Sequence, residues 1–126
     1  PELMERYGAR AADLAAGMKP SEYSRILNAF AKASYEHDRM LNIFTKAMVG
    51  KLPYFLPPDL SNVCNAYAKF RRREQALFRR FSLEMPHKLP KFEAHELRNV
   101  ANSYARLSVR DDLLFDDIAD EVMRRP

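Results

Sequence analysis

A seven-residue motif occurs three times in this chain at a constant spacing. Residues 27–33 read LNAFAKA, residues 64–70 read CNAYAKF, and residues 101–107 read ANSYARL. The asparagines of the motif, Asn28, Asn65 and Asn102, are separated by 37 residues each time. A constant period between about 20 and 50 residues is typical of a tandem repeat array. The period constrains the fold more than any single motif, because every copy is expected to adopt the same local structure.

Apolar residues follow the same period outside the motif. Eight sets of three recur 37 residues apart: Tyr23/Leu60/Leu97, Ile26/Val63/Val100, Phe30/Tyr67/Tyr104, Ala31/Ala68/Ala105, Met40/Leu77/Leu114, Leu41/Phe78/Phe115, Phe44/Phe81/Ile118 and Met48/Met85/Val122. In each copy these sets form two stripes with three-and-four spacing, which is the pattern of an amphipathic helix. A short polar segment separates the two stripes (residues 34–38, 71–75 and 108–112). Each copy is therefore predicted to be a helical hairpin.

Signals for helix ends and helix starts also recur. Gly50 and Pro53 follow the second stripe of one copy, and Pro86 and Pro90 follow that of the next. Glycine just after a helix and proline beyond it are common terminators. An acidic residue opens each first helix in register: Glu22, Asp59 and Glu96. The positive end of the helix dipole favours negative charge at that position.

The sequence therefore predicts an all-α protein, a right-handed solenoid of tandem 37-residue helix-turn-helix repeats. Residues 18–54, 55–91 and 92–126 are expected to be repeats 1, 2 and 3 of one continuous solenoid. Residues 1–17 are expected to be the second helix of a truncated repeat and its linker. Neither end carries the polar outer face that caps a free-standing solenoid. We thus expect a piece of a longer chain, or an assembly in which neighbouring protein subunits cover the uncapped ends.

Several function classes find no support in the sequence. No apolar run approaches the length of a membrane span, and the one cysteine, Cys64, lies in an apolar column and excludes an internal disulfide framework. The three glycines are isolated, so they form no phosphate-binding loop. His37, His87 and His95 lack a second ligand at metal spacing. We expect no catalysis, no metal, no cofactor, no small-molecule substrate and no membrane association.

The charges of the chain are unevenly distributed. The formal net charge is +4, yet residues 69–88 hold seven basic and two acidic residues. Residues 110–125 hold three basic and six acidic residues. Such asymmetry indicates a polyanionic partner on the basic side. We interpret the acidic helix at the other end as a solvated helix face.

A polar stripe recurs on each predicted first helix. Its members are Ser24-Asn28-Lys32, Ser61-Asn65-Lys69 and Arg98-Asn102-Arg106. Positions i, i+4 and i+8 lie near one face of a helix, and stacked repeats would place the three stripes side by side. The result is a ladder of amides, which both donate and accept hydrogen bonds, edged by cations that neutralise phosphates. Such a surface suits a single-stranded nucleic acid, whose bases are free to be read.

We expect the following RNA-binding residues: Asn28, Lys32, Ser61, Asn65, Lys69, Arg71, Arg72, Arg73, Arg79, Arg80, Arg98, Asn102 and Arg106. Three alternatives stay open. The amides could bond the backbone of the next repeat, the cations could be solvated helix ends, or the amides could hold an extended peptide. The aromatic residues Phe30, Tyr67 and Tyr104 lie within an apolar stripe, so we assign them to the core and not to base stacking.

The repeat resembles a known family. The resemblance lies in the 37-residue period, first helices similar to NAYAK, an aromatic residue two positions after the asparagine, and LF at the start of the second helix. These features resemble the heptatricopeptide repeat of organellar RNA-binding proteins, which often precedes a RAP domain and is abundant in apicomplexan parasites. The repeat is also similar to octotricopeptide repeats and to the repeat region of FAST-kinase-like mitochondrial proteins. The resemblance spans essentially all 126 residues, and CNAYAKF…LFRRF is its most specific part.

The resemblance implies a protein of the mitochondrial matrix that acts on RNA without catalysis. It implies a mitochondrial ribosome subunit or an rRNA-stabilising factor that contacts single-stranded or fragmented rRNA. No RAP domain is recognisable in the chain, and no targeting segment is visible. The alternative is a tetratricopeptide-like scaffold, a structural subunit of a mitochondrial complex that contacts only proteins. An open asparagine stripe favours RNA, whereas amides occupied by the next repeat favour the scaffold.

Overall fold

A computed structural model describes residues 2–126, and all regular secondary structure in that range is helical. The α-helices are α1 (Glu2–Leu14), α2 (Pro20–Lys32), α3 (Asp38–Val49), α4 (Pro57–Lys69), α5 (Gln75–Glu84), α6 (Ala94–Arg106) and α7 (Asp112–Arg124). Short 3₁₀ helices follow α1, α3 and α5: η1 (Ala15–Gly17), η2 (Leu52–Tyr54) and η3 (Pro86–Lys91). The prediction of an all-α chain is confirmed for the described residues.

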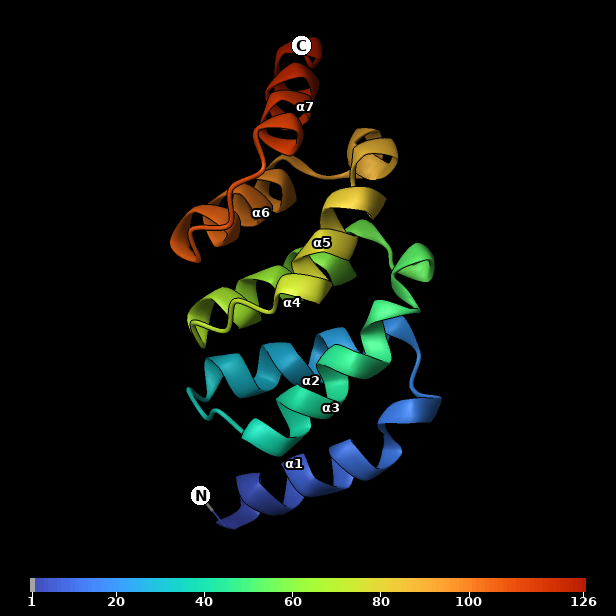
Figure 1. Ribbon diagram of the computed structural model, residues 1–126, viewed down its shortest axis with the longest axis vertical. Helices are drawn as coiled ribbons and strands as arrows, with labels where there is room; N and C mark the ends of the chain where they lie inside the picture. The colour runs from blue at the N-terminus through green and yellow to red at the C-terminus, as the bar shows by residue number, and fades with distance from the viewer. Residues whose placement is uncertain (1) are drawn as a thin grey trace.

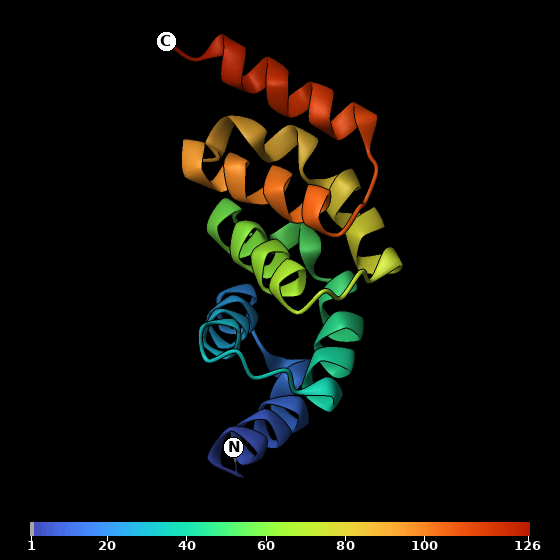
Figure 2. The same ribbon diagram turned by 90° about the vertical axis from the view of Figure 1, so that its left-hand side faces the viewer.

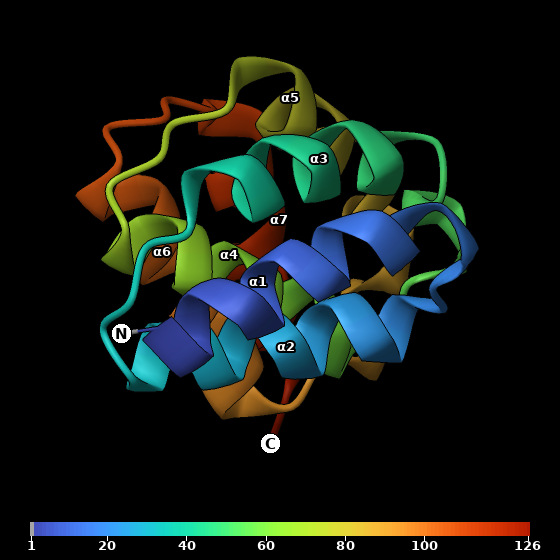
Figure 3. The same cartoon turned by 90° about the horizontal axis from the view of Figure 1, so that it is seen from below.

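The helices form three successive hairpins, α2–α3, α4–α5 and α6–α7, stacked along the long axis of the molecule (Figure 1). The first helices of the hairpins begin 37 residues apart, at Pro20, Pro57 and Ala94. Helix α4 packs along both α2 and α6, while α3 packs against α1 and α5. The molecule thus has two layers of helices, visible when it is turned (Figure 2) and when it is viewed from below, with one hairpin behind another (Figure 3).

A buried aromatic column connects the second and third hairpins to the hairpin before each. Tyr67 and Tyr104 are 0 % exposed and Phe30 is 4 % exposed, which confirms their assignment to the core. The hydroxyl of Tyr67 bonds that of Thr45 at 2.7 Å, and the hydroxyl of Tyr104 bonds that of Ser82 at 3.0 Å. Burial raises the pKa of both tyrosines above the ordinary value. These rings are therefore unavailable for stacking on bases, and the hydroxyls of the two tyrosines link neighbouring hairpins.

The first helices begin as the acidic residues predict. In each one, the carboxylate at the third helical position accepts a hydrogen bond from the backbone N–H of the residue before the helix. The pairs are Glu22 with Lys19 at 2.8 Å, Asp59 with Leu56 at 3.1 Å, and Glu96 with Glu93 at 2.7 Å. Each carboxylate therefore fixes the direction in which the chain enters the helix.

The starts of the second helices differ from one another. His37 Nδ1 caps α3 by accepting from Met40 N at 3.1 Å, and Asp111 Oδ1 caps α7 by accepting from Leu114 N at 3.0 Å. Glu74 stands at the same register position before α5 but makes no side-chain capping bond. The N-terminus of α5 therefore keeps more unbonded N–H groups than its two counterparts.

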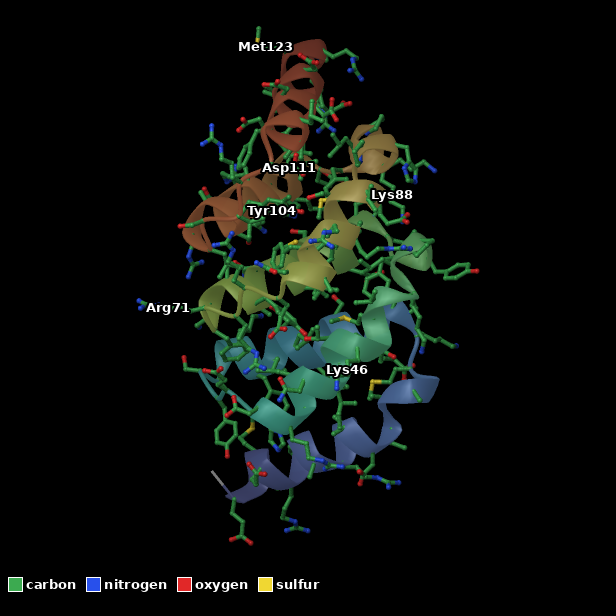
Figure 4. The ribbon with its side chains drawn as sticks, in the orientation of Figure 1. Lys46, Arg71, Lys88, Tyr104, Asp111 and Met123 are labelled. Atoms are coloured by element: carbon green, nitrogen blue, oxygen red, sulfur yellow. The ribbon has the colours of Figure 1, made fainter. Side chains whose placement is uncertain are left out.

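Each first helix ends in the same left-handed turn. Ser34, Arg71 and Ser108 have φ values of 54°, 56° and 54°. After α4, the N–H of Arg71 donates to Ala68 O at 3.0 Å and that of Arg72 donates to Tyr67 O at 2.9 Å. This paired pattern is a Schellman motif, in which glycine is the usual left-handed residue. The turn points the Arg71 side chain away from the helix into solvent (Figure 4).

Basic residues tie each hairpin to the linker that precedes it. Lys51, Lys88 and Arg125 are spaced by 37 residues, and each donates to backbone carbonyls of the preceding linker. Lys51 Nζ reaches Ala16 O at 2.8 Å and Met18 O at 3.1 Å. Lys88 Nζ reaches Leu52 O at 3.2 Å, Pro53 O at 2.9 Å and Phe55 O at 2.8 Å. Arg125 Nη2 reaches Leu89 O at 3.2 Å and Phe92 O at 2.6 Å. We call these three side chains the linker clamps; Lys88 is labelled in Figure 4.

Candidate nucleic-acid interface

The amides and cations at the centre of the predicted stripe occupy equivalent positions on three parallel-stacked helices. We define the first-helix strip as Asn28, Lys32, Asn65, Lys69, Asn102 and Arg106. Its three cations are exposed and each is the last residue of α2, α4 or α6. A cation there interacts favourably with the negative end of the helix dipole. Within residues 2–126 none of the three makes an ion pair, so their charge remains free for a ligand.

The asparagines of the strip are open. Asn28 and Asn65 are half-buried and Asn102 is exposed, and in the described part of the chain their amides take part in no hydrogen bond. The backbone of the neighbouring hairpin therefore does not occupy them. This arrangement is the one that favours RNA over a purely structural amide ladder.

A different pair of asparagines forms the polar contact between first helices. Asn62 Nδ2 donates to Ser24 Oγ at 3.2 Å, and Asn99 Nδ2 donates to Ser61 Oγ at 3.3 Å. Ser61 is 2 % exposed, so the structure places this predicted site residue between helices and away from solvent. Sequence reasoning missed the pairing because the column of Asn62 holds Arg25 in the first copy, which hides the repetition.

Arg98 stands one period after Ser61 but is exposed. Since no helix of the described chain packs on that side of α6 as α6 packs on α4, its side chain is free of the contact that buries the serines. The third stripe therefore presents Arg98 as well as Asn102 and Arg106 to solvent.

The three consecutive arginines after α4 have different surroundings. Arg71 and Arg73 are exposed, without ion pairs in residues 2–126. The Arg72 side chain is only 15 % exposed, and its guanidinium contacts Glu36 at 3.2 Å and Asp38 at 3.0 Å. The structure therefore uses Arg72 to join hairpins and leaves its two neighbours free.

The two arginines of α5 also differ. Arg79 is exposed and carries no ion pair among the described residues, whereas Arg80 is half-buried and lies 3.6 Å from Glu84 on the same helix. Of this pair, Arg79 is the one placed to meet a ligand.

Exposed arginines line two adjoining hollows. One is lined by Arg71, Arg73 and Arg106, with Ala68 and Leu107. The other lies between α5 and the turn before α7, and its basic lining is Arg73, Arg79 and Arg110. Arg73 belongs to both. Sequence reasoning misses Arg110, because this residue lies in the acidic segment of residues 110–125.

Two further findings bear on the kind of site. In residues 2–126, no three His, Cys, Asp or Glu side chains are grouped as metal ligands. None of the helices in the same range has both the length and the apolar composition needed to cross a bilayer.

Fold and surface together define a class: all-helical proteins made of stacked hairpins, with open amides and unpaired cations on the stacked first helices. Within this class the chain belongs to the RESC6 family, the RNA-editing substrate-binding complex 6 proteins, whose family model matches residues 1–125. A comparison with curated proteins finds no match. The family description names an editing complex and no ribosome, so the expectation of a mitochondrial ribosome subunit is not supported. The resemblance to heptatricopeptide repeats stays a prediction.

Proposed function

We propose that this chain is a non-catalytic RNA-binding subunit of an RNA-editing substrate-binding complex, and that single-stranded RNA lies across α2, α4 and α6. The family description supports the complex and its RNA substrate. The observation that supports the RNA path is the first-helix strip, in which open amides adjoin unpaired cations on three neighbouring helices.

Two kinds of side chain in the strip contact different parts of the RNA. Lys32, Lys69 and Arg106 neutralise phosphates, which supplies most of the affinity and makes it depend on salt. Asn28, Asn65 and Asn102 donate to and accept from bases or riboses. Because the neighbouring aromatic rings are buried, recognition uses hydrogen bonds instead of stacking.

We also propose the architecture of the chain and its location in the cell. The proposed architecture is a right-handed solenoid of 37-residue repeats, with α1 as the second helix of a truncated repeat. The equal spacing of the helix starts and the stacking of α2, α4 and α6 support the repeat. The layer of first helices is the more closely packed of the two, which supports a strip on the inner side of the solenoid. The mitochondrion is the location that the repeat resemblance supports.

A salt series tests the RNA path. Binding of a fluorescein-labelled single-stranded RNA is measured by anisotropy between low and physiological salt, for the wild type and for Lys32→Gln/Lys69→Gln. Each phosphate contact contributes about 0.7 to the slope of log K against log salt for single strands, so the double variant should flatten the slope by about 1.4. Arg106 is left unchanged because it also lines a hollow.

The matched control is Lys46→Gln/Lys91→Gln. Both lysines are exposed and carry no ion pair in the described residues, and neither lies on a first helix; Lys46 is labelled on α3 in Figure 4. The control removes the same charge and should keep the wild-type slope. Equal slopes for the strip variant and the control would contradict an RNA path along the strip.

A protein scaffold is the second candidate, and one observation favours it. Large apolar side chains are exposed on α1 and on α7: Leu3 (54 %), Tyr7 (57 %), Leu113 (78 %) and Met123 (83 %). Met123 projects at the far end of the stack in Figure 4. We propose that neighbouring protein subunits of the complex cover these two faces. A chain that binds such subunits yet shows no salt-dependent RNA binding would make the scaffold the function.

A further inference from the structure

The hollow between α5 and the turn before α7 can be compared with the equivalent place one period earlier in the chain. At the preceding junction, between α3 and the turn before α5, the Arg72 side chain reaches across and contacts Glu36, Asp38 and Asn42. An arginine side chain thus fills an acidic recess there. The Arg72 side chain is only 15 % exposed, so this recess is occupied by the protein itself.

Arg72 also pairs with Glu74 at 3.3 Å. One period later Asp111 keeps the acidic charge of Glu74, but the other members of the contact have changed. Val109 stands where Arg72 stands in the preceding junction, and it has no cationic head to cross the gap. The positions of Glu36, Asp38 and Asn42 are taken, in that order, by Arg73, Gln75 and Arg79. The recess has therefore lost two of its three carboxylates, gained two guanidinium groups and lost the side chain that filled it.

The result is an open basic hollow of about 290 Å³. Arg73, Gln75, Arg79 and Val109 all line it, so the four exchanged positions surround one space. Arg73 and Arg79 carry no ion pair among residues 2–126. Arg110 adds a third guanidinium, which lies 3.4 Å from Asp112 on the exposed surface.

Asp111 is the one acidic residue in the lining. Its Oδ1 accepts the capping hydrogen bond from Leu114 N at 3.0 Å, so one oxygen of this carboxylate is already hydrogen-bonded at the start of α7. Gln75 supplies an amide donor, and the side-chain-uncapped start of α5 adds a favourable field. The balance of charge at the hollow is positive, and two of its guanidinium groups have no partner in the described part of the chain.

We infer that this hollow binds a phosphate group of RNA. Guanidinium groups match the geometry of phosphate oxygens and bind them through paired, charge-assisted hydrogen bonds. The adjoining hollow, lined by Arg71, Arg73 and Arg106, shares Arg73 and ends at the first-helix strip. It therefore forms a basic path from the strip to the phosphate hollow, along which one RNA strand can run.

This inference rests on the proposed RNA binding but not on the strip. The phosphate can be a backbone phosphodiester or a terminal phosphate, since the chemistry of recognition is the same. Labelled RNAs with a 5′-hydroxyl and with a 5′-phosphate distinguish the two sources.

The test converts the second junction into the first. A variant with Arg73→Glu, Gln75→Asp, Arg79→Asn and Val109→Arg reproduces the residues of the preceding junction, which the same fold already accommodates. Its unfolding by urea should therefore remain cooperative with a midpoint near that of the wild type. RNA affinity at about 0.1 M salt should fall by about ten-fold or more, and the salt slope by at least about 0.7.

A charge-removal pair separates a specific site from general electrostatics. Arg73→Gln/Arg79→Gln removes two charges from the hollow, and Arg6→Gln/Arg10→Gln removes two from exposed positions on α1. The first pair should lose affinity and slope while the second keeps both. Loss with both RNAs assigns a backbone phosphate, and loss only with the 5′-phosphorylated RNA assigns a terminal phosphate.

Three results would overturn the inference. If the hollow variants bind RNA like the α1 control while Lys32→Gln/Lys69→Gln loses slope, the hollow binds no phosphate although the proposed function stands. If the wild type binds no RNA, the proposed function and this inference fail together. If RNA binding is unchanged but binding of a poly-glutamate peptide is lost in the hollow variants, the hollow is a docking site for an acidic protein segment.

Discussion

Replacing Lys88 by methionine tests how much a linker clamp stabilises the fold. The ammonium group donates to three carbonyls, at 3.2, 2.9 and 2.8 Å. Two of these carbonyls belong to the buried residues Leu52 and Phe55, which are 0 % and 1 % exposed, while Pro53 is exposed. Methionine keeps an unbranched apolar stem of similar shape but provides no donor. The variant therefore removes the three hydrogen bonds with little change in packing.

The expected loss follows from the burial of the acceptors. A hydrogen bond to a charged group contributes about 1.5–3 kcal/mol net, and a carbonyl left buried without a donor bears its desolvation cost. Water can replace the donor at Pro53, and a single ammonium shared by three acceptors contributes less than three separate bonds. We expect Lys88→Met to lower the free energy of unfolding by about 3 kcal/mol.

The measurement is urea unfolding followed by circular dichroism at 222 nm, with the dependence on urea concentration compared between variants. Lys91→Met is the matched control, because Lys91 is an exposed residue of the same 3₁₀ helix and has no hydrogen-bonded partner in the described chain. It should change stability by less than about 0.5 kcal/mol. A loss below about 1 kcal/mol for Lys88→Met, or one equal to the control, would refute the reasoning, since it would mean that water satisfies the buried carbonyls.

Three other changes test the turns and the core. Arg71→Gly should stabilise the fold by about 1 kcal/mol in urea unfolding, because φ of 56° suits glycine, and yet weaken RNA binding; a less stable variant would contradict the turn assignment. Gly8→Ala should destabilise by about 2 kcal/mol, because its methyl group would overlap the imidazole that caps α3, whereas Gly17→Ala, with open space around it, should be nearly neutral. The raised pKa values of Tyr67 and Tyr104 stabilise the fold at and below the ordinary value of 10.0, and this contribution is lost as pH rises above it. Tyrosinate absorbance from these two rings should therefore appear only together with loss of helical signal; titration without unfolding would contradict their burial.

The elements that sequence alone predicted are those set by local pattern. The column Phe30/Tyr67/Tyr104 predicted buried rings, and all three are buried. The acidic residues at the helix starts predicted favourable interactions there, and each accepts a backbone hydrogen bond. Such features depend on a helix and its own ends, which the spacing of apolar residues determines.

The run of three arginines after α4 shows what the spacing of apolar residues does not predict. Arg71, Arg72 and Arg73 are adjacent and chemically identical, but the left-handed turn at Arg71 sends their side chains in different directions. Only Arg72 meets Glu36 and Asp38, which come from the preceding hairpin. Contacts between hairpins depend on the turn geometry and on the register of packing, and a charge count contains neither.

The polar contact between first helices is hidden for a second reason, besides the Arg25 in the column of Asn62. Ser24 pairs with Asn62 across two helices, so the two partners occupy different columns of the repeat. A search for residues that recur at one position finds the more prominent Asn28 column instead. Comparing each position with the one 38 residues later, as in the Ser24–Asn62 and Ser61–Asn99 pairs, could have found the contact.

The linker clamps have a direction. Lys51, Lys88 and Arg125 each donate to carbonyls that lie 33 to 36 residues earlier in the chain. A growing chain synthesised from its N-terminus therefore presents the acceptors before the donor arrives, and each new hairpin docks on a surface that is already complete. A pulling force applied at the C-terminus would break the Arg125 contacts first, then those of Lys88 and finally those of Lys51. The hairpins would therefore detach one after another.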